Sequence, residues 1–289
     1  MKVAVATDTN SGITKAEAEE LGLYLLPMPV IVDGQMYLEG VDITSEQLYA
    51  AMKQHQSISS SQPSPGQLLD LWDGALADGF DELVYIPMSS GLSSSCSNAA
   101  QFSAEYDGRV QVVDDHRISV TQRASALAAL KMAQEGLRAA EIRAQLEAQA
   151  YDASIYITVD SLEYLKKGGR ITPAVATLAT VLNLKPVLTI QGDKLDAFAK
   201  VRGMKLAETK MIEAAMQDRL GRFGAFSDAE LQVETAGTFE DTERAAQWRQ
   251  QVQEVFPNAV VSYAQLPCSI ACHVGMNAAG VAVMKRHTH

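Results

Sequence analysis

The chain has 289 residues, of which 47% are apolar and 20% are charged, proportions typical of a soluble globular protein. Its formal net charge of −11 argues against nucleic acid and anionic membranes as partners, because both require a basic surface. Three cysteines are too few for a disulfide framework, and no apolar run is long enough to span a bilayer. We therefore expect a cytoplasmic protein that contacts membranes at most transiently.

The first half of the chain alternates between predicted strands and helices. An apolar strand over 2–6 leads to a helix over 14–22, and 23–32 and 35–38 flank Asp33-Gly34, a strong hairpin signal. Further helices are predicted over 44–54, 64–79, 119–133 and 139–150, and further strands over 83–86 and 109–113. This order predicts a mostly parallel sheet covered on both faces by helices.

Capping signals mark the starts of three of these helices. Thr14, Thr44 and Ser64 are each followed three residues later by Glu or Gln, the pattern of a capping box. Pro65 also stands at the first helical position after Ser64, where its missing N–H is not needed.

The pattern changes after about residue 152. Strands are predicted over 153–159, 230–235, 259–264 and 281–284, with a hairpin of 185–191 and 194–200 around Gly192-Asp193. Helices are predicted over 162–167, from Pro173 through 182, and over 204–220 and 238–255. Hairpins mixed with helices predict an α+β domain with a mixed sheet. The fold class is therefore α/β, with an N-terminal domain over 1–152 and a C-terminal domain over 153–289.

Five serines occur within seven residues, 89–95, directly after the predicted strand at 83–86. A buried strand that ends in small hydroxyl residues and opens a helix places N–H groups and hydroxyls around one point. Such a point suits a carboxylate or a phosphate. The alternative is that these serines only cap the helix and fill the turn.

Four polar segments are candidates for a single pocket at the domain junction. They are Ser60-Ser61-Gln62, Ser93-Ser94-Ser95, Gly168-Gly169-Arg170 and Cys272-His273-Val274-Gly275. The first two offer hydroxyl donors from the first domain, and the last two lie in predicted turns of the second. Arg170 offers a planar fork to an anion, unless it is an ordinary surface arginine. His273 offers a donor or a pH-sensitive contact, unless it is a structural histidine.

Other chemistries receive less support from the sequence. Cys268, Cys272 and His273 have no visible fourth ligand at a zinc spacing, so no metal site is predicted. Dinucleotide-binding and phosphate-loop motifs are also missing, so no cofactor is predicted. Ser93 and His273 could belong to a hydrolase triad with an acid, although no nucleophile elbow supports it.

The chain resembles the DegV family along nearly its whole length, in the order and spacing of five segments. These segments are Ser60-Ser61-Gln62-Pro63-Ser64, Ser89-Ser90-Gly91-Leu92-Ser93, LEYLKKGGRI at 162–171, Leu182-Asn183-Leu184-Lys185-Pro186-Val187 and His273-Val274-Gly275. The LEYLKKGGRI run is the most specific of them. The opening Thr7-Asp8-Thr9-Asn10-Ser11 also resembles the family's first turn.

The resemblance implies a bacterial carrier that is not itself an enzyme. It implies a long-chain fatty acid whose carboxylate lies at the domain junction and whose tail occupies an apolar tunnel. A separate DAK-type fatty acid kinase would convert the bound acid to an acyl phosphate for phospholipid synthesis, supplying ATP and metal. On this resemblance Ser60 and Ser93 bond the carboxylate. Arg170 and His273 contact the head group or its phosphorylated form, with Arg202 as a further basic neighbour.

Two departures from the family pattern concern the head group. Ser94-Ser95 stands where the family usually has Gly-Thr, and Gly275-Met276-Asn277 stands where it usually has Gly-Pro-Gly. Ser94 thus adds a hydroxyl, and Asn277 adds a polar group near the expected head. Ser61, next to Ser60, is a further candidate contact. Two other functions remain open: a Ser-dependent acyl hydrolase or transferase that uses Ser93 and His273, and a lipid-responsive adaptor.

Overall fold

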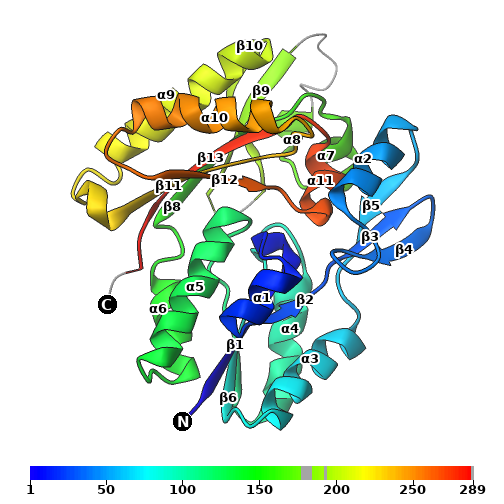
Figure 1. Ribbon diagram of the computed structural model, residues 1–289, viewed down its shortest axis with the longest axis vertical. Helices are drawn as coiled ribbons and strands as arrows, with labels where there is room; N and C mark the ends of the chain where they lie inside the picture. The colour runs from blue at the N-terminus through cyan, green and yellow to red at the C-terminus, as the bar shows by residue number, and fades with distance from the viewer. Residues whose placement is uncertain (177–183, 192–193, 288–289) are drawn as a thin grey trace. The chain divides into compact units, whose positions relative to one another are not determined.

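The computed structural model describes residues 1–176, 184–191 and 194–287 (Figure 1). The chain forms two compact units, an N-terminal unit of residues 1–151 and a C-terminal unit of residues 152–289. The end of the helix predicted from Pro173 and the hairpin turn at Gly192-Asp193 lie outside the described residues. None of the helices in the described ranges combines the length and the apolar character needed to cross a bilayer.

The main sheet of the N-terminal unit is parallel, as predicted, with the strand order β2-β1-β6-β7. Its strands are β1 (Val3–Asp8), β2 (Tyr24–Leu26), β6 (Glu82–Ile86) and β7 (Val110–Val112). The register places Val5 opposite Val84. Every residue of β1 and β6 is buried, which is expected for central strands of a parallel sheet covered on both faces.

Five helices cover the two faces of this sheet (Figure 1). They are α1 (Lys15–Leu21), α3 (Pro65–Ala77), α4 (Ser95–Ser103), α5 (Val120–Gln134) and α6 (Ala139–Ala148). Val3 and Val5 pack in one core with α1, α5 and α6, and Ala4 and Ala6 pack in the other with α3 and α4. The alternation of side chains along a strand explains why successive residues enter different cores.

Both hydrogen bonds of the predicted capping box form at Thr44 and at Ser64, and one of the two forms at Thr14. Thr14 accepts a hydrogen bond from the backbone N–H of Glu17, and Ser64 and Gln67 bond reciprocally at the start of α3. Thr44 and Gln47 form the same reciprocal pair at the start of α2 (Ser45–Lys53). Each cap supplies an acceptor to an N–H group that has no partner within its own helix.

A small antiparallel sheet has the order β4-β3-β5. It comprises β3 (Pro29–Val32), β4 (Gln35–Leu38) and β5 (Ile58–Ser60). Asp33 and Gly34 both have positive φ, 47° and 82°, so the predicted hairpin turn is confirmed as the type that favours Asp-Gly. The prediction of one strand over 23–32 is wrong, because Pro27 and Met28 separate β2 of the parallel sheet from β3. The three-residue β5 was too short for the sequence to indicate.

The C-terminal unit contains a mixed six-stranded sheet with the order β10-β9-β8-β13-β11-β12, in which only β11 and β12 pair in parallel. Its strands are β8 (Ala153–Thr158), β9 (Leu184–Ile190), β10 (Asp196–Arg202), β11 (Leu231–Gly237), β12 (Val261–Gln265) and β13 (Ala279–Lys285). β13, the least certain strand from the sequence, lies at the centre. Its first six residues are all buried, so it lacks the alternating pattern by which half-buried strands are recognised.

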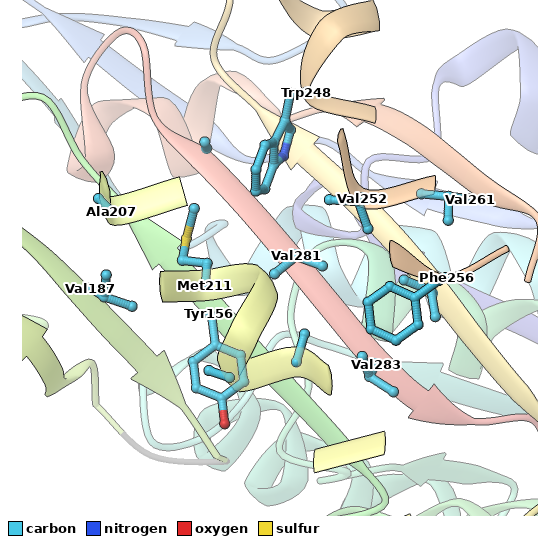
Figure 2. Packing of buried hydrophobic residues seen from close by; sticks show 14 of the residues in the cluster. Tyr156, Val187, Ala207, Met211, Trp248, Val252, Phe256, Val261, Val281 and Val283 are labelled. Atoms are coloured by element: carbon cyan, nitrogen blue, oxygen red, sulfur yellow. The ribbon is translucent and has the colours of Figure 1, made fainter. Parts of the chain in front are cut away.

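Two long helices, α9 (Met204–Leu220) and α10 (Thr242–Val255), cover one face of this sheet (Figure 1). Figure 2 shows the core beneath them, where Trp248 and Met211 meet Val281 of the central strand. The described part of the unit also contains three shorter helices, α7 (Glu163–Gly168), α8 (Pro173–Ala176) and α11 (Cys268–Val274). Short 3-10 turns lie at Thr9–Ser11, Ala104–Tyr106 and Asp228–Glu230.

Gly74 offers a direct test of helix propensity in the N-terminal unit. It lies inside α3, it is exposed, and an added Cβ would meet no atom within 4 Å. We expect Gly74→Ala to raise the free energy of unfolding by about 0.5–1 kcal/mol, because alanine loses less backbone entropy in a helix. Urea denaturation followed by circular dichroism measures the change. Gly34→Ala should have the opposite sign because φ is 82° there, and equal effects at the two positions would contradict the explanation.

Candidate functional site

Three loops of the N-terminal unit converge at the carboxyl end of its parallel sheet. The last residue of β1 is tied to the loop after β6, because Met88 N–H donates to Oδ2 of Asp8 at 3.1 Å. The loop after β1 is tied to the loop after β7, because Ser119 N–H donates to the carbonyl of Asn10 at 3.1 Å. The chain leaves β1 toward one edge of the sheet and β6 toward the other. A point where strand order divides in this way is where open α/β sheets bind ligands.

The serine loop, residues 89–95, uses most of its backbone N–H groups internally. Its donors and acceptors are Ser89 N to Arg117 O at 2.8 Å, Ser90 N to Asp114 Oδ1 at 3.2 Å, Gly91 N to Ser89 Oγ at 3.1 Å, Ser93 N to Ser89 O at 3.2 Å and Ser95 N to Ser93 Oγ at 3.1 Å. The expectation that these five backbone groups face an anion is therefore wrong.

Ser93 is the serine best arranged to donate a hydrogen bond. Its Oγ accepts from the N–H of Ser95, and the described residues contain no acceptor for its own proton. A hydroxyl has one proton and two lone pairs, so an outside acceptor can still be bound. The capping alternative also holds in part, since Ser93 satisfies a donor in the first turn of α4. Ser94 is exposed and makes no side-chain cap bond.

Ser60 and Ser61 are linked to the same helix. Ser60 ends β5 opposite Val30, and Ser61 donates its N–H to the carbonyl of Pro29 at 3.0 Å. The next residue, Gln62, accepts a hydrogen bond at Oε1 from Nδ2 of Asn98 in α4, at 2.9 Å. The structure thus joins the segments that contain Ser60 and Ser93. The Gln62–Asn98 bond spans 36 residues and was missed because no local pattern signals it.

A small cavity of about 60 Å³ lies beside this link. Its polar lining comes from Gln62, Ser95 and Asn98, and its apolar lining includes Leu68 and Phe102. The volume is sufficient for one or two water molecules and far too small for an acyl chain.

In the C-terminal unit the Gly168-Gly169-Arg170 segment and His273 come together, because α7 packs against α11 (Figure 1). A Cβ on Gly168 would clash with Nδ1 of His273 and lie 3.1 Å from its Cε1. A Cβ on Gly275, whose φ is 72°, would lie 2.8 Å from the ring of Tyr164. Both glycines are therefore required for close approach between the two helices.

The prediction that residues 272–275 form a turn is wrong. Cys272, His273 and Val274 are the last residues of α11, and only Gly275 follows the helix. The helix was missed because its seven residues are mostly small and six of them are buried, so no amphipathic pattern marks it. Asn277 lies in the turn after it with φ of 60°, and its side chain is exposed.

Arg170 is not an isolated surface residue. It is half-buried, its guanidinium donates to the carbonyl of Gly168, and its own carbonyl accepts from Leu195 N–H at 3.1 Å. Burial, with the positive charge of Arg170 adding to it, lowers the pKa of His273 from 6.5 to about 4. The imidazole is therefore neutral at pH 7. It therefore adds no second positive charge beside Arg170.

Arg202 is not part of this cluster. It ends β10 and is exposed, whereas the Arg170 loop is bonded to Leu195, just before the other end of that strand. A strand of this length separates its two ends by about 20 Å. The structure therefore brings Arg170 and His273 together and leaves Arg202 apart from them.

Gly168→Ala should destabilise the C-terminal unit by about 1–3 kcal/mol, because the new methyl group overpacks the contact with His273. The measurement is urea denaturation combined with the histidine NMR signals, which should move. Gly169→Ala is the matched control. It places alanine at φ of 67° but meets nothing within 4 Å, so it should cost stability without moving the His273 signal. An unmoved signal in Gly168→Ala would contradict the contact.

Comparisons with known proteins give one consistent family. The family model described as "Uncharacterised protein, DegV family" matches residues 2–286. A DegV domain-containing protein of Deinococcus radiodurans is 34% identical over 214 residues, covering 74% of this chain and 76% of that protein. A DegV domain-containing protein of Listeria monocytogenes is 31% identical, covering 97% of both chains.

Among solved structures, this chain is similar to one described as "Fatty Acid Binding of a DegV family Protein from Thermus thermophilus". That structure has a TM-score of 0.86 and 28% sequence identity, and the match covers 99% of this chain and 100% of that one. The matches to the family model and to the Listeria monocytogenes protein extend over both units. This chain therefore belongs to the DegV family.

Proposed function

We propose that this protein binds a long-chain fatty acid, and that hydroxyls of the N-terminal unit bond its carboxylate. The observation that carries the proposal is the geometry of Ser93, whose Oγ accepts from Ser95 N–H and whose proton remains available to an outside acceptor. Ser60 is proposed as the second donor, because the Gln62–Asn98 bond joins its segment to the same helix. The similarity to the Thermus thermophilus protein, which is described as binding fatty acid, supports the choice of ligand.

We propose that Arg170 and His273 contact the same head group from the C-terminal unit, at the junction of the two domains. Their chemistry fits a carboxylate that must later be released. His273 is neutral at pH 7, so one positive charge rather than two would face the acid. Apolar burial of the tail supplies the affinity, because each methylene contributes roughly 0.8 kcal/mol. The proposed tail site is an apolar tunnel, and Ser61, Ser94 and Asn277 are proposed only as outer contacts. Arg202 is not proposed as a contact, because it ends β10 far from Arg170.

We further propose that the protein is a carrier which presents the carboxylate to a separate DAK-type kinase in the cytoplasm. A serine nucleophile needs a base that takes its proton. The only bond of Ser93 Oγ among the described residues is the one it accepts from Ser95 N–H. This arrangement favours a binding hydroxyl over a hydrolase or transferase nucleophile.

The test compares palmitate with methyl palmitate by displacement of a fluorescent fatty acid. Ser93→Ala should weaken palmitate binding by about 1–2 kcal/mol, the usual loss for a hydrogen bond to a charged group, and leave the ester nearly unchanged. Ser97→Ala is the matched control, because Ser97 lies in the same helix and donates to the carbonyl of Ser94. Its affinity for palmitate should equal that of the wild type.

Two results would contradict the proposal. If the wild-type protein does not bind palmitate, the proposal that its ligand is a long-chain fatty acid is wrong. Stoichiometric labelling of Ser93 by a fluorophosphonate would instead indicate a nucleophile.

A further inference from the structure

Asp8 is a buried carboxylate at the end of β1, with a side chain that is 0% exposed. Oδ1 accepts from Asn10 N–H at 3.0 Å, from Asn10 Nδ2 at 2.9 Å and from Gln122 Nε2 at 3.0 Å. Oδ2 accepts from Met88 N–H at 3.1 Å. All four donors are neutral, and no lysine or arginine in the described ranges forms an ion pair with Asp8. Burying a carboxylate among neutral groups costs free energy, so the presence of Asp8 at this position requires an explanation.

The contacts of Asp8 determine where the serine loop leaves the sheet. Met88 lies between the last residue of β6, Ile86, and the loop that begins at Ser89. The carbonyl of Ile86 accepts from Thr7 Oγ1 at 2.6 Å and from Gln122 Nε2 at 3.1 Å. Both the carbonyl before the loop and the N–H at its entrance are therefore held by β1 and α5.

The position of Ser93 follows from this anchor through a short series of bonds. The carbonyl of Ser89, the residue after Met88, accepts the N–H of Leu92 at 3.1 Å and of Ser93 at 3.2 Å. Oγ of Ser89 accepts the N–H of Gly91 at 3.1 Å. Once Met88 is fixed, these bonds fix the path of the loop as far as Ser93.

The side-chain amide of Gln122, which holds Asp8 and the carbonyl of Ile86, is itself incompletely hydrogen-bonded. Its Nε2 has two protons but lies within hydrogen-bond distance of three acceptors, on Thr7, Asp8 and Ile86. Its Oε1 is buried and finds no donor among the described residues. A buried amide left incompletely satisfied destabilises the fold.

We infer that Asp8 is a positioning residue for the ligand hydroxyl of Ser93, acting through the N–H of Met88 rather than by touching the ligand. This inference rests on the proposed function, since it assigns to Asp8 a part of the selectivity for a carboxylate. In Asp8→Asn, an NH₂ group replaces one carboxylate oxygen and therefore faces a hydrogen-bond donor, such as the N–H of Met88. Because two donors repel each other, the backbone at Met88, where the serine loop begins, must then move.

The test is a double-mutant cycle of Asp8→Asn and Ser93→Ala, read as the affinity for palmitate and for hexadecanol. Asp8→Asn should weaken palmitate about tenfold and change hexadecanol little, because the hydroxyl is misaligned with the carboxylate. In the Ser93→Ala background the same substitution should change palmitate affinity less than about twofold. Equal losses in both backgrounds would overturn the inference.

Glu82→Gln is the matched control for losing a buried carboxylate. Glu82 begins β6, at the opposite end of the strand from Met88, and bonds Arg138 and the N–H of Ala139. It should lower stability without changing the ratio of palmitate to hexadecanol affinity. If Glu82→Gln also changes the ratio of palmitate to hexadecanol affinity, that ratio reports only the loss of stability. The inference would then be overturned.

Hydrogen exchange separates this inference from the proposed function. Exchange at Met88 and Ser93 should accelerate in Asp8→Asn and remain unchanged in Glu82→Gln, whether or not palmitate binds. If the wild type binds no palmitate, the proposed function fails; unchanged exchange in Asp8→Asn refutes the anchor itself. Should Asp8→Asn not fold, Gln122→Met removes one donor from Asp8 and should shift the affinity ratio in the same direction.

Discussion

Trp248→Ala is expected to lower the free energy of unfolding of the C-terminal unit by about 3–5 kcal/mol, the usual loss for truncating a buried tryptophan. Trp248 is 0% exposed, and it packs in the core that contains Met211 and Val281 (Figure 2). Its Nε1 donates to the carbonyl of Gly280, in the central strand β13, at 2.9 Å. Removal leaves both a cavity and an acceptor without its donor.

The chain contains a natural control for this experiment, since it has two tryptophans. Trp72 in the N-terminal unit is also 0% exposed, but its Nε1 is buried without a partner among the described residues. Trp248→Phe should therefore cost about 1 kcal/mol more than Trp72→Phe, because only Trp248→Phe breaks a hydrogen bond. Urea denaturation by circular dichroism gives both values. In Trp248→Phe the remaining tryptophan, Trp72, reports the N-terminal unit by fluorescence. Equal costs would contradict the assigned role of the Gly280 bond.

His273 is expected to make the C-terminal unit less stable as the pH falls from about 6.5 to about 4. Burial and Arg170 lower the folded-state pKa of His273 from 6.5 to about 4, so the unfolded chain binds the proton more tightly. The stability contribution is complete above pH 6.5 and is lost as the pH falls through this window. A difference of this size corresponds to about 3 kcal/mol.

The measurement is the free energy of unfolding at several pH values for the wild type, His273→Gln and His55→Gln. His273→Gln should flatten the curve between pH 6.5 and 4. His55 is exposed, so its substitution should leave the curve unchanged. Burial raises the pKa of Glu208 in the same unit, which acts in the opposite direction, so the difference between variants is the informative quantity. Parallel curves for wild type and His273→Gln would refute the assignment.

The features that the sequence predicted well depend on neighbours along the chain. The caps at Thr14, Thr44 and Ser64 involve residues three positions apart, and the Asp33-Gly34 hairpin depends on two adjacent φ angles. The helix over 204–220 was also predicted with its observed bounds. The order and spacing of five short segments indicated the DegV family. The match of the family model to residues 2–286 then established it.

The features that the sequence did not reveal join residues that lie far apart along the chain. Asp8 bonds Met88 across 80 positions, Gln62 bonds Asn98 across 36, and Gly168 makes room for His273. Six of the seven residues of α11 are buried, so this helix lacks the periodicity by which a surface element is recognised. From the sequence alone came the fold class, the helix caps, the Asp33-Gly34 hairpin turn and the candidate hydroxyl, arginine and histidine residues. The packing decided which of those residues meet and which backbone donors remain, because side-chain burial and long-range hydrogen bonds exist only once distant segments have come together.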